Sequence, residues 1–129
     1  MLAMRKLVES ICKSCEPYSQ IFVKSLAGVS VNLTYTDIGF EFNIKIREDG
    51  AMIPDWRLDE RTDLAIHAPF SVWNGILSGT LDYRRAYLEG MLRCQGSMAT
   101  FLKGSAVMST IIRVVRQRDL LACAEALAE

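Results

Sequence analysis

Apolar and polar side chains alternate along residues 29–36 and again along residues 40–47. This period of two is typical of strands that bury one face of a sheet and leave the other in water. Asp37 and Gly39 interrupt the alternation between the two runs. The pattern therefore predicts two antiparallel strands joined by a tight turn, with Phe42 and Ile44 facing the core and Asn43 facing solvent.

Three shorter segments have the same strand character. Glu48, Asp49 and Gly50 indicate a hairpin turn, which leads into a short strand over residues 51–54. Residues 63–67, which place Leu64 and Ile66 inward, and residues 91–95 supply the other two. We therefore expect a sheet of about five strands, mostly antiparallel.

Helical spacing dominates the two ends of the chain. Residues 1–15 form an amphipathic pattern that Pro17 interrupts, and a second helical piece precedes Gly28. After residue 96 we expect a short helix over residues 98–102 that ends at Gly104, and a long apolar helix capped by Ser105. A further apolar stretch covers residues 120–128.

Two more short helices are expected between residues 70 and 90. Ser71 is the predicted cap of the first, and Gly79 lies just past its end. Asp82 is the predicted cap of the second, over residues 83–89, which Gly90 can terminate. The expected fold class is α+β, with helices covering one face of the sheet.

The length of 129 residues fits a single domain, 1–129. It divides into an N-terminal helical part, 1–27, a central part of sheet and helices, 29–104, and a C-terminal helical segment, 105–129. The 15 basic and 15 acidic residues balance, which argues against nucleic acid as a partner. Neither a membrane-spanning run nor a signal-peptide pattern is present, so a cytoplasmic protein is expected.

Catalytic and metal-binding patterns are missing from the sequence. The single histidine, His67, lies at the end of a predicted strand without a nucleophile motif nearby. Cys12 and Cys15 lie in a helical pattern rather than after a strand, and neither Cys94 nor Cys123 has a neighbour at metal-ligand spacing. We expect reduced, buried thiols, no metal, no cofactor and no enzymatic activity.

The order and spacing of Ser71, Gly79, Leu81-Asp82, Ala86, Gly90 and Gly96 resemble the sterol carrier protein 2 family, over roughly residues 38–104. Thr80, Met91 and Ser97 depart from the charged residues that family members often carry there. The resemblance implies that a lipid is held in an apolar cavity between the sheet and the helices. We assign twelve ligand-binding residues to that cavity: Phe42, Ile44, Ile66, Phe70, Trp73, Ile76, Leu77, Phe101, Leu102, Val107, Met108 and Ile111.

The function predicted from this resemblance is reversible binding, and transfer, of a lipid-like ligand such as a sterol, a fatty acyl chain or an isoprenoid. The alternative is an accessory or interaction module of a lipid or isoprenoid-quinone biosynthetic complex. An enzyme with a site near His67 ranks last. The terminal helices leave two further roles open, transient contact with a membrane and formation of a homodimer.

Overall fold

The computed structural model describes residues 2–21, 26–57 and 62–117. Four α-helices, one 3-10 helix and five strands make up this part of the chain. In chain order they are α1 (Leu2–Ser14), η1 (Glu16–Ile21), β1 (Ser30–Tyr35), β2 (Phe40–Ile46), β3 (Met52–Asp55), β4 (Leu64–Ala68), α2 (Phe70–Ser78), α3 (Tyr83–Leu88), β5 (Arg93–Gln95) and α4 (Met98–Gln117). The expected break at Pro17 is confirmed, because α1 ends at Ser14 and a 3-10 turn follows.

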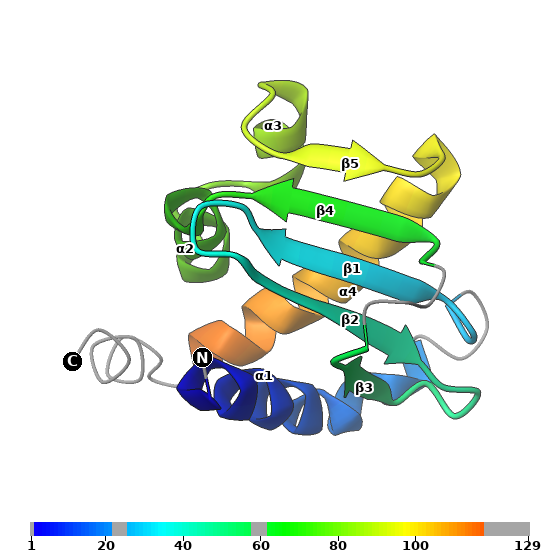
Figure 1. The fold of residues 1–129 in the computed structure, drawn as a ribbon. Coiled ribbons are helices and arrows are strands. Elements are labelled where there is room, and N and C mark those ends of the chain that lie inside the picture. Colours follow the sequence, from blue (N-terminus) through cyan, green and yellow to red (C-terminus); the bar gives the residue numbers. More distant parts are fainter. Residues whose placement is uncertain (1, 22–25, 58–61, 118–129) are drawn as a thin grey trace.

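The five strands form one mixed sheet in the order β3-β2-β1-β4-β5 (Figure 1). Three of the four pairings are antiparallel, as predicted, and the turn between β1 and β2 sets Val31 opposite Ile44. The central pair, β1 with β4, is parallel, with Val31 opposite Leu64. A parallel pair needs a long connection rather than a hairpin, and the chain between residues 36 and 63 provides it.

Helix α4 crosses one face of the sheet diagonally, while α1 lies along the β3 edge and packs against α4 (Figure 1). Helix α2 lies at the end of the sheet where β1 and β4 finish, and α3 lies beyond β5. The inward side chains of the strands, among them Val31, Ile44 and Ile66, meet this helical layer and are almost completely buried. The predicted α+β architecture is therefore confirmed.

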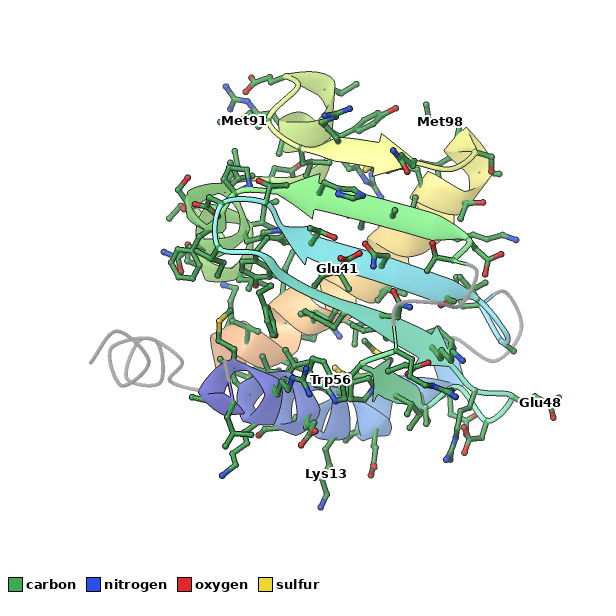
Figure 2. The ribbon with its side chains drawn as sticks, viewed as in Figure 1. Lys13, Glu41, Glu48, Trp56, Met91 and Met98 are labelled. Atoms are coloured by element: carbon green, nitrogen blue, oxygen red, sulfur yellow. The ribbon has the colours of Figure 1, made fainter. Side chains whose placement is uncertain are left out.

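The opposite face of the sheet is polar, as Glu41 shows in Figure 2. Asn43, which we predicted to face solvent, is 1% exposed. Its side chain accepts a hydrogen bond from Nδ2 of Asn32 (2.9 Å) and donates one to the carbonyl of Arg57 (3.1 Å), so the segment after β3 covers this part of the face. Nδ2 of Asn32 also donates to Glu41 at 2.9 Å. The prediction was wrong because the alternating pattern shows which side chains are polar, not which are exposed. An amide side chain whose groups are hydrogen-bonded can be buried at little cost in free energy.

Asp82 caps α3 as predicted, by accepting a hydrogen bond from the backbone N–H of Arg85 at 3.0 Å. The predicted cap of α2 was wrong, since that helix begins at Phe70 and includes Ser71. Its first-turn N–H is satisfied from elsewhere, because Asp37 in the β1–β2 turn accepts from the backbone N–H of Phe70 at 2.9 Å.

Helix α4 is continuous, so the predicted break at Gly104 was also wrong. Gly104 and Ser105 lie inside the helix, and Oγ of Ser105 donates back to the carbonyl of Leu102. By length and composition α4 is long and apolar enough to cross a membrane, but half of it is buried inside the fold, as expected for a core helix. The apolar stretch predicted for residues 120–128 lies outside the described residues.

Candidate functional site

The layer between the sheet and α4 contains nine of the twelve predicted cavity residues, each at most 6% exposed. They are Phe42, Ile44, Ile66, Trp73, Ile76, Phe101, Val107, Met108 and Ile111, and all belong to one apolar cluster. Leu77 packs against the edge of this cluster. Phe70 and Leu102 are about half exposed, at 46% and 54%, so they do not lie in the buried layer.

Trp73 anchors the end of this layer where α2 meets the sheet. Its ring stacks on Tyr35 with 5.5 Å between the centroids, and its indole N–H donates to the carbonyl of Thr34 at 2.9 Å. The donor is therefore satisfied although the side chain is 1% exposed. This contact fixes the first turns of α2 and with them Ile76, which lies one turn further on.

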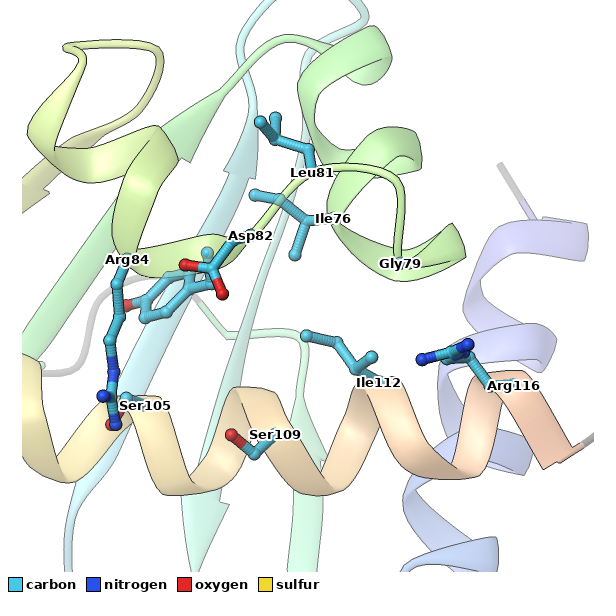
Figure 3. A pocket seen from close by; sticks show the side chains of 10 residues that line it. Ile76, Gly79, Leu81, Asp82, Arg84, Ser105, Ser109, Ile112 and Arg116 are labelled. Carbon is cyan, nitrogen blue, oxygen red and sulfur yellow. The ribbon is translucent and has the colours of Figure 1, made fainter.

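Ile76 also lines a pocket of about 310 Å³ between α4 and the segment that joins α2 to α3 (Figure 3). Its apolar wall comes from Ile76, Leu81 and Ile112. The remaining lining residues are Gly79, Asp82, Tyr83, Arg84, Ser105, Ser109 and Arg116. The pocket is therefore amphipathic, with an apolar wall that continues into the core and polar groups that face water.

Two arginines give the polar side of this pocket its positive charge, and Asp82 contributes a carboxylate. Arg84 extends from α3 toward Ser105 on α4, and Arg116 lies at the far end near Gly79 (Figure 3). A Cβ atom at Gly79 would lie 3.3 Å from Cζ of Arg116, so the guanidinium packs over the glycine at the end of α2. Helix ends of this kind carry partial negative charge, which favours a cation there. Among the described residues, neither arginine has a carboxylate in ion-pair contact.

Aromatic rings join α3 to α4 beside the pocket. Tyr83 stacks on Phe101 with centroids 5.2 Å apart, and Tyr87 lies 4.3 Å from the same ring. Burial raises the pKa of the Tyr83 hydroxyl far above its usual range. The tyrosine is therefore neutral at physiological pH and acts as a rigid apolar support for the pocket.

The cysteines do not form a reactive or metal-binding site within the described residues. Burial raises the pKa of Cys12 to about 12 and that of Cys15 to about 11, so both thiols stay protonated at neutral pH. Cys94 lies on β5, across the sheet from α1. The described part of the chain holds no group of three His, Cys, Asp or Glu side chains that could bind a metal ion. Cys123 lies outside it.

His67 lies on the polar face of β4, where the strand register places it opposite Arg93 of β5 and Thr34 of β1. It is half-buried and is not among the residues that line the pocket. A general base would need a nucleophile or a substrate site within hydrogen-bond reach. Among the described residues, no hydrogen bond joins the His67 ring to a nucleophile, and the hydroxyl of Thr34 donates to Asn32 instead.

A family model described as the SCP-2 sterol transfer family matches residues 8–109, which is most of the chain. The chain belongs to this family. Members of the SCP-2 family are lipid-binding modules, generally without enzymatic activity of their own. No curated protein matches the chain by sequence at a significant level.

Solved structures with the SCP-2 fold resemble the chain over most of its length. A sterol carrier protein domain 2 from Helicoverpa armigera is 17% identical, with a TM-score of 0.59 over 90% of both chains. Sterol Carrier Protein 2 Like 2 from Aedes aegypti is 14% identical, with a TM-score of 0.58 over 82% of this chain and 96% of that one. A protein described as "UbiJ-SCP2 Ubiquinone synthesis protein" is 13% identical, with a TM-score of 0.59 over 85% and 86%. At these identities the likeness shows a common fold.

In this SCP-2 family chain, sequence reasoning missed most of the pocket lining. Of the twelve predicted residues, only Ile76 lines the pocket between α4 and the α2–α3 segment. The apolar cavity between the sheet and the helices stays a prediction. Leu81 and Ile112 could have been found from the amphipathic spacing of their segments. Arg84 and Arg116 carried no such signal, because isolated surface arginines are common and only the packing of α3 and α2 against α4 brings them to one opening.

Proposed function

We propose that this chain reversibly binds and transfers a lipid-like ligand with a long apolar part, such as a sterol, a fatty acyl chain or an isoprenoid. Membership in the SCP-2 sterol transfer family carries the proposal. The amphipathic pocket supports it, because its apolar wall leads from solvent to the core cluster around Ile76. No bond chemistry is needed for this function, since the driving force is removal of the apolar chain from water.

The pocket suggests how such a ligand is oriented. We place the apolar part along Ile76, Leu81 and Ile112, and the polar end near Arg84 and Arg116. A volume of about 310 Å³ is at the lower end of small-molecule sites, so a long chain must also displace side chains of the layer under α4. Met108 and Ile111 are the buried neighbours on that helix, and methionine adapts easily to a changed cavity.

The expected affinity suits a carrier that must also release its cargo. Burying about 12 methylenes at about 0.8 kcal/mol each yields roughly 10 kcal/mol. Loss of rigid-body freedom removes about 4 kcal/mol or more, which leaves a dissociation constant of roughly tens of micromolar.

The direct test is native mass spectrometry of the purified chain, with displacement of a fluorescent fatty acid as the solution assay. Ile112→Asp places a carboxylate on the partly buried apolar wall of the pocket and should weaken binding at least tenfold, because desolvating that charge costs several kcal/mol. Ile53→Asp, the same change at an exposed site on β3, is the control and should bind normally. Ile111→Asp is less informative, since Ile111 is 6% exposed and a charge there would unfold the core. Equal binding by both variants and the parent, or no lipid binding at all, would refute the proposal.

A second candidate is an accessory or interaction module of a lipid or isoprenoid-quinone biosynthetic complex. The resemblance in fold to the ubiquinone synthesis protein favours it. The same mass spectrum separates the two candidates, because a chain that only holds a complex together carries no lipid and is recovered with protein partners instead.

A further inference from the structure

Large apolar side chains are concentrated on the surface around strand β5. Of the eight large apolar residues that the described chain exposes, four lie between residues 88 and 102. We call these four, Leu88, Met91, Met98 and Leu102, the β5 rim. Leu88 is the most exposed of all at 81%, and the other three are between 42% and 59% exposed. The other four exposed residues, Leu2, Ile38, Ile53 and Phe70, come from different elements.

The β5 rim runs along one border of the molecule. Strand β5 is the last strand on its side of the sheet, and Met91 and Met98 flank its two ends (Figure 2). Leu88 ends α3 just before Met91, and Leu102 lies one helical turn after Met98 on α4. The rim therefore combines the ends of two helices with an edge strand, and the same two helices, α3 and α4, also contribute residues to the pocket lining.

Unpaired positive charge accompanies these apolar side chains. Arg93 on β5 and Lys103 on α4 are exposed, and neither has an ion-pair partner among the described residues. The acidic groups nearby already accept hydrogen bonds: Glu89 binds Arg85 at 2.9 Å and Asp82 caps α3. Asp63, which lies next to Gly96, accepts from the backbone N–H of Ser30 at 2.9 Å. A partner that lies on the rim thus meets apolar groups and free cations, without a free carboxylate between them.

We propose that the β5 rim docks the protein on the surface of an anionic lipid bilayer. The proposal rests in part on the proposed function, since a carrier must exchange its ligand with a membrane. Interfacial binding of this kind combines inserted apolar side chains with attraction between Lys or Arg and anionic headgroups. Arg84, which lines the pocket, lies on α3, the helix that ends at Leu88 of the rim.

Two alternatives fit the structure less well. The amphipathic helix α1 uses its apolar side within the fold, where Cys12 is buried and Met4, Val8 and Ile11 pack against the core. Apart from Leu2 at its first residue, which is 68% exposed, the large apolar side chains of α1 are at least partly buried. A second protein could add a strand to β5, but that strand has only three residues and offers a short template.

The test is flotation of the purified full chain with vesicles of equal parts phosphatidylcholine and phosphatidylglycerol, compared with pure phosphatidylcholine. The wild type should bind the anionic vesicles more tightly and lose this preference at high salt. Arg93→Glu with Lys103→Glu should weaken binding to anionic vesicles by a factor of about 25 or more, because each cation contributes a factor of about five. Met91→Gln with Met98→Gln should weaken binding to both kinds of vesicle. Leu2→Gln with Ile53→Gln is the matched control, because it makes the same type of exposed change elsewhere.

Binding of a fluorescent fatty acid without vesicles separates this inference from the proposed function. All the rim variants should keep that binding, since none of the four substituted residues lines the pocket. Unchanged flotation of the rim variants, or equal loss in the control, would overturn the proposal. The wild type could instead bind no vesicles and form dimers that the Met91→Gln/Met98→Gln variant cannot form. That result would assign the rim to a second copy of the chain and would also overturn the proposal. Vesicle binding by a chain that binds no fatty acid would refute the proposed function and leave the docking surface standing.

Discussion

Gly104 allows α4 to approach the sheet closely, so replacing it with alanine should destabilise the fold. A Cβ atom at this position would overlap Cδ2 of Leu64. Leu64 is 1% exposed, and its other methyl group already lies 3.2 Å from where a Cβ of Gly96 would be. The leucine side chain thus occupies the space that two glycines leave free, and it cannot rotate away from Gly104 without meeting Gly96.

Two opposing terms set the size of the effect. Overpacking a core typically costs about 2 kcal/mol, while alanine in the middle of a helix is favoured over glycine by about 1 kcal/mol. We expect Gly104→Ala to lower the free energy of unfolding by about 1 kcal/mol. In a Leu64→Val background the methyl group that clashes is absent, so the same change should raise stability by about 1 kcal/mol. The coupling energy between the two sites is then about 2 kcal/mol, within the usual range for residues in contact.

Urea unfolding, followed by the fluorescence of the buried Trp73, measures the stability of the wild type, the two single variants and the double variant. The change of sign between the two backgrounds is the decisive result, because a general effect of alanine on helix stability would be the same in both. A stabilising Gly104→Ala in the wild type, or equal effects in the two backgrounds, would show that α4 and Leu64 do not make this contact.

Three further predictions concern helix ends and thiols. Asp82→Ala should lower the free energy of unfolding by about 1 kcal/mol in urea titrations, because it removes the cap of α3. Asp82→Asn should keep most of the stability that the cap provides, because asparagine is also a good cap. Asp37→Ala should cost a similar roughly 1 kcal/mol, since it leaves the N–H of Phe70 without its acceptor, and hydrogen exchange at that amide should accelerate. Cys12 and Cys15 should resist iodoacetamide at pH 8 in the native state and react in urea, as read by peptide mass spectrometry. Burial raises the pKa of Cys12 from 9.0 to about 12. The protonated Cys12 thiol therefore contributes its full stability below pH 9, and this contribution is lost as the pH rises toward 12. In a Cys12→Ala variant, the free energy of unfolding should fall less between pH 9 and pH 12.

The sheet could be predicted from sequence because period-two alternation is a local signal. Leu64 and Ile66 reveal their strand and its inward face without knowledge of any partner. The cap at Asp82 was predictable for the same reason, since its hydrogen bond reaches only three residues along the chain. Local signals of this kind, from strand alternation or a helix cap, do not depend on contacts with distant parts of the chain.

Features that depend on distant contacts were predicted poorly. Gly104 suggested a helix end, but it lies inside α4. Its missing side chain leaves room for Leu64 of β4, forty residues earlier in the sequence. Asp37 was recognised as a turn residue and not as the cap of a helix that begins at Phe70. The pocket combines both difficulties, because Ile112 and Arg84 come from separate helices and only the packed fold places them together.

The parallel pairing of β1 with β4 has a consequence for the order in which the chain folds. The pairs β1–β2 and β2–β3 join neighbours in sequence, so each closes a short loop and can form early. Val31 and Leu64 are 33 residues apart, and their pairing must close the loop that contains that whole meander. We therefore expect the slow step of refolding to be the pairing of β4 with β1, together with the packing of α4 against Leu64. Substitutions at Leu64 should slow refolding, because they weaken the pairing that forms in this step.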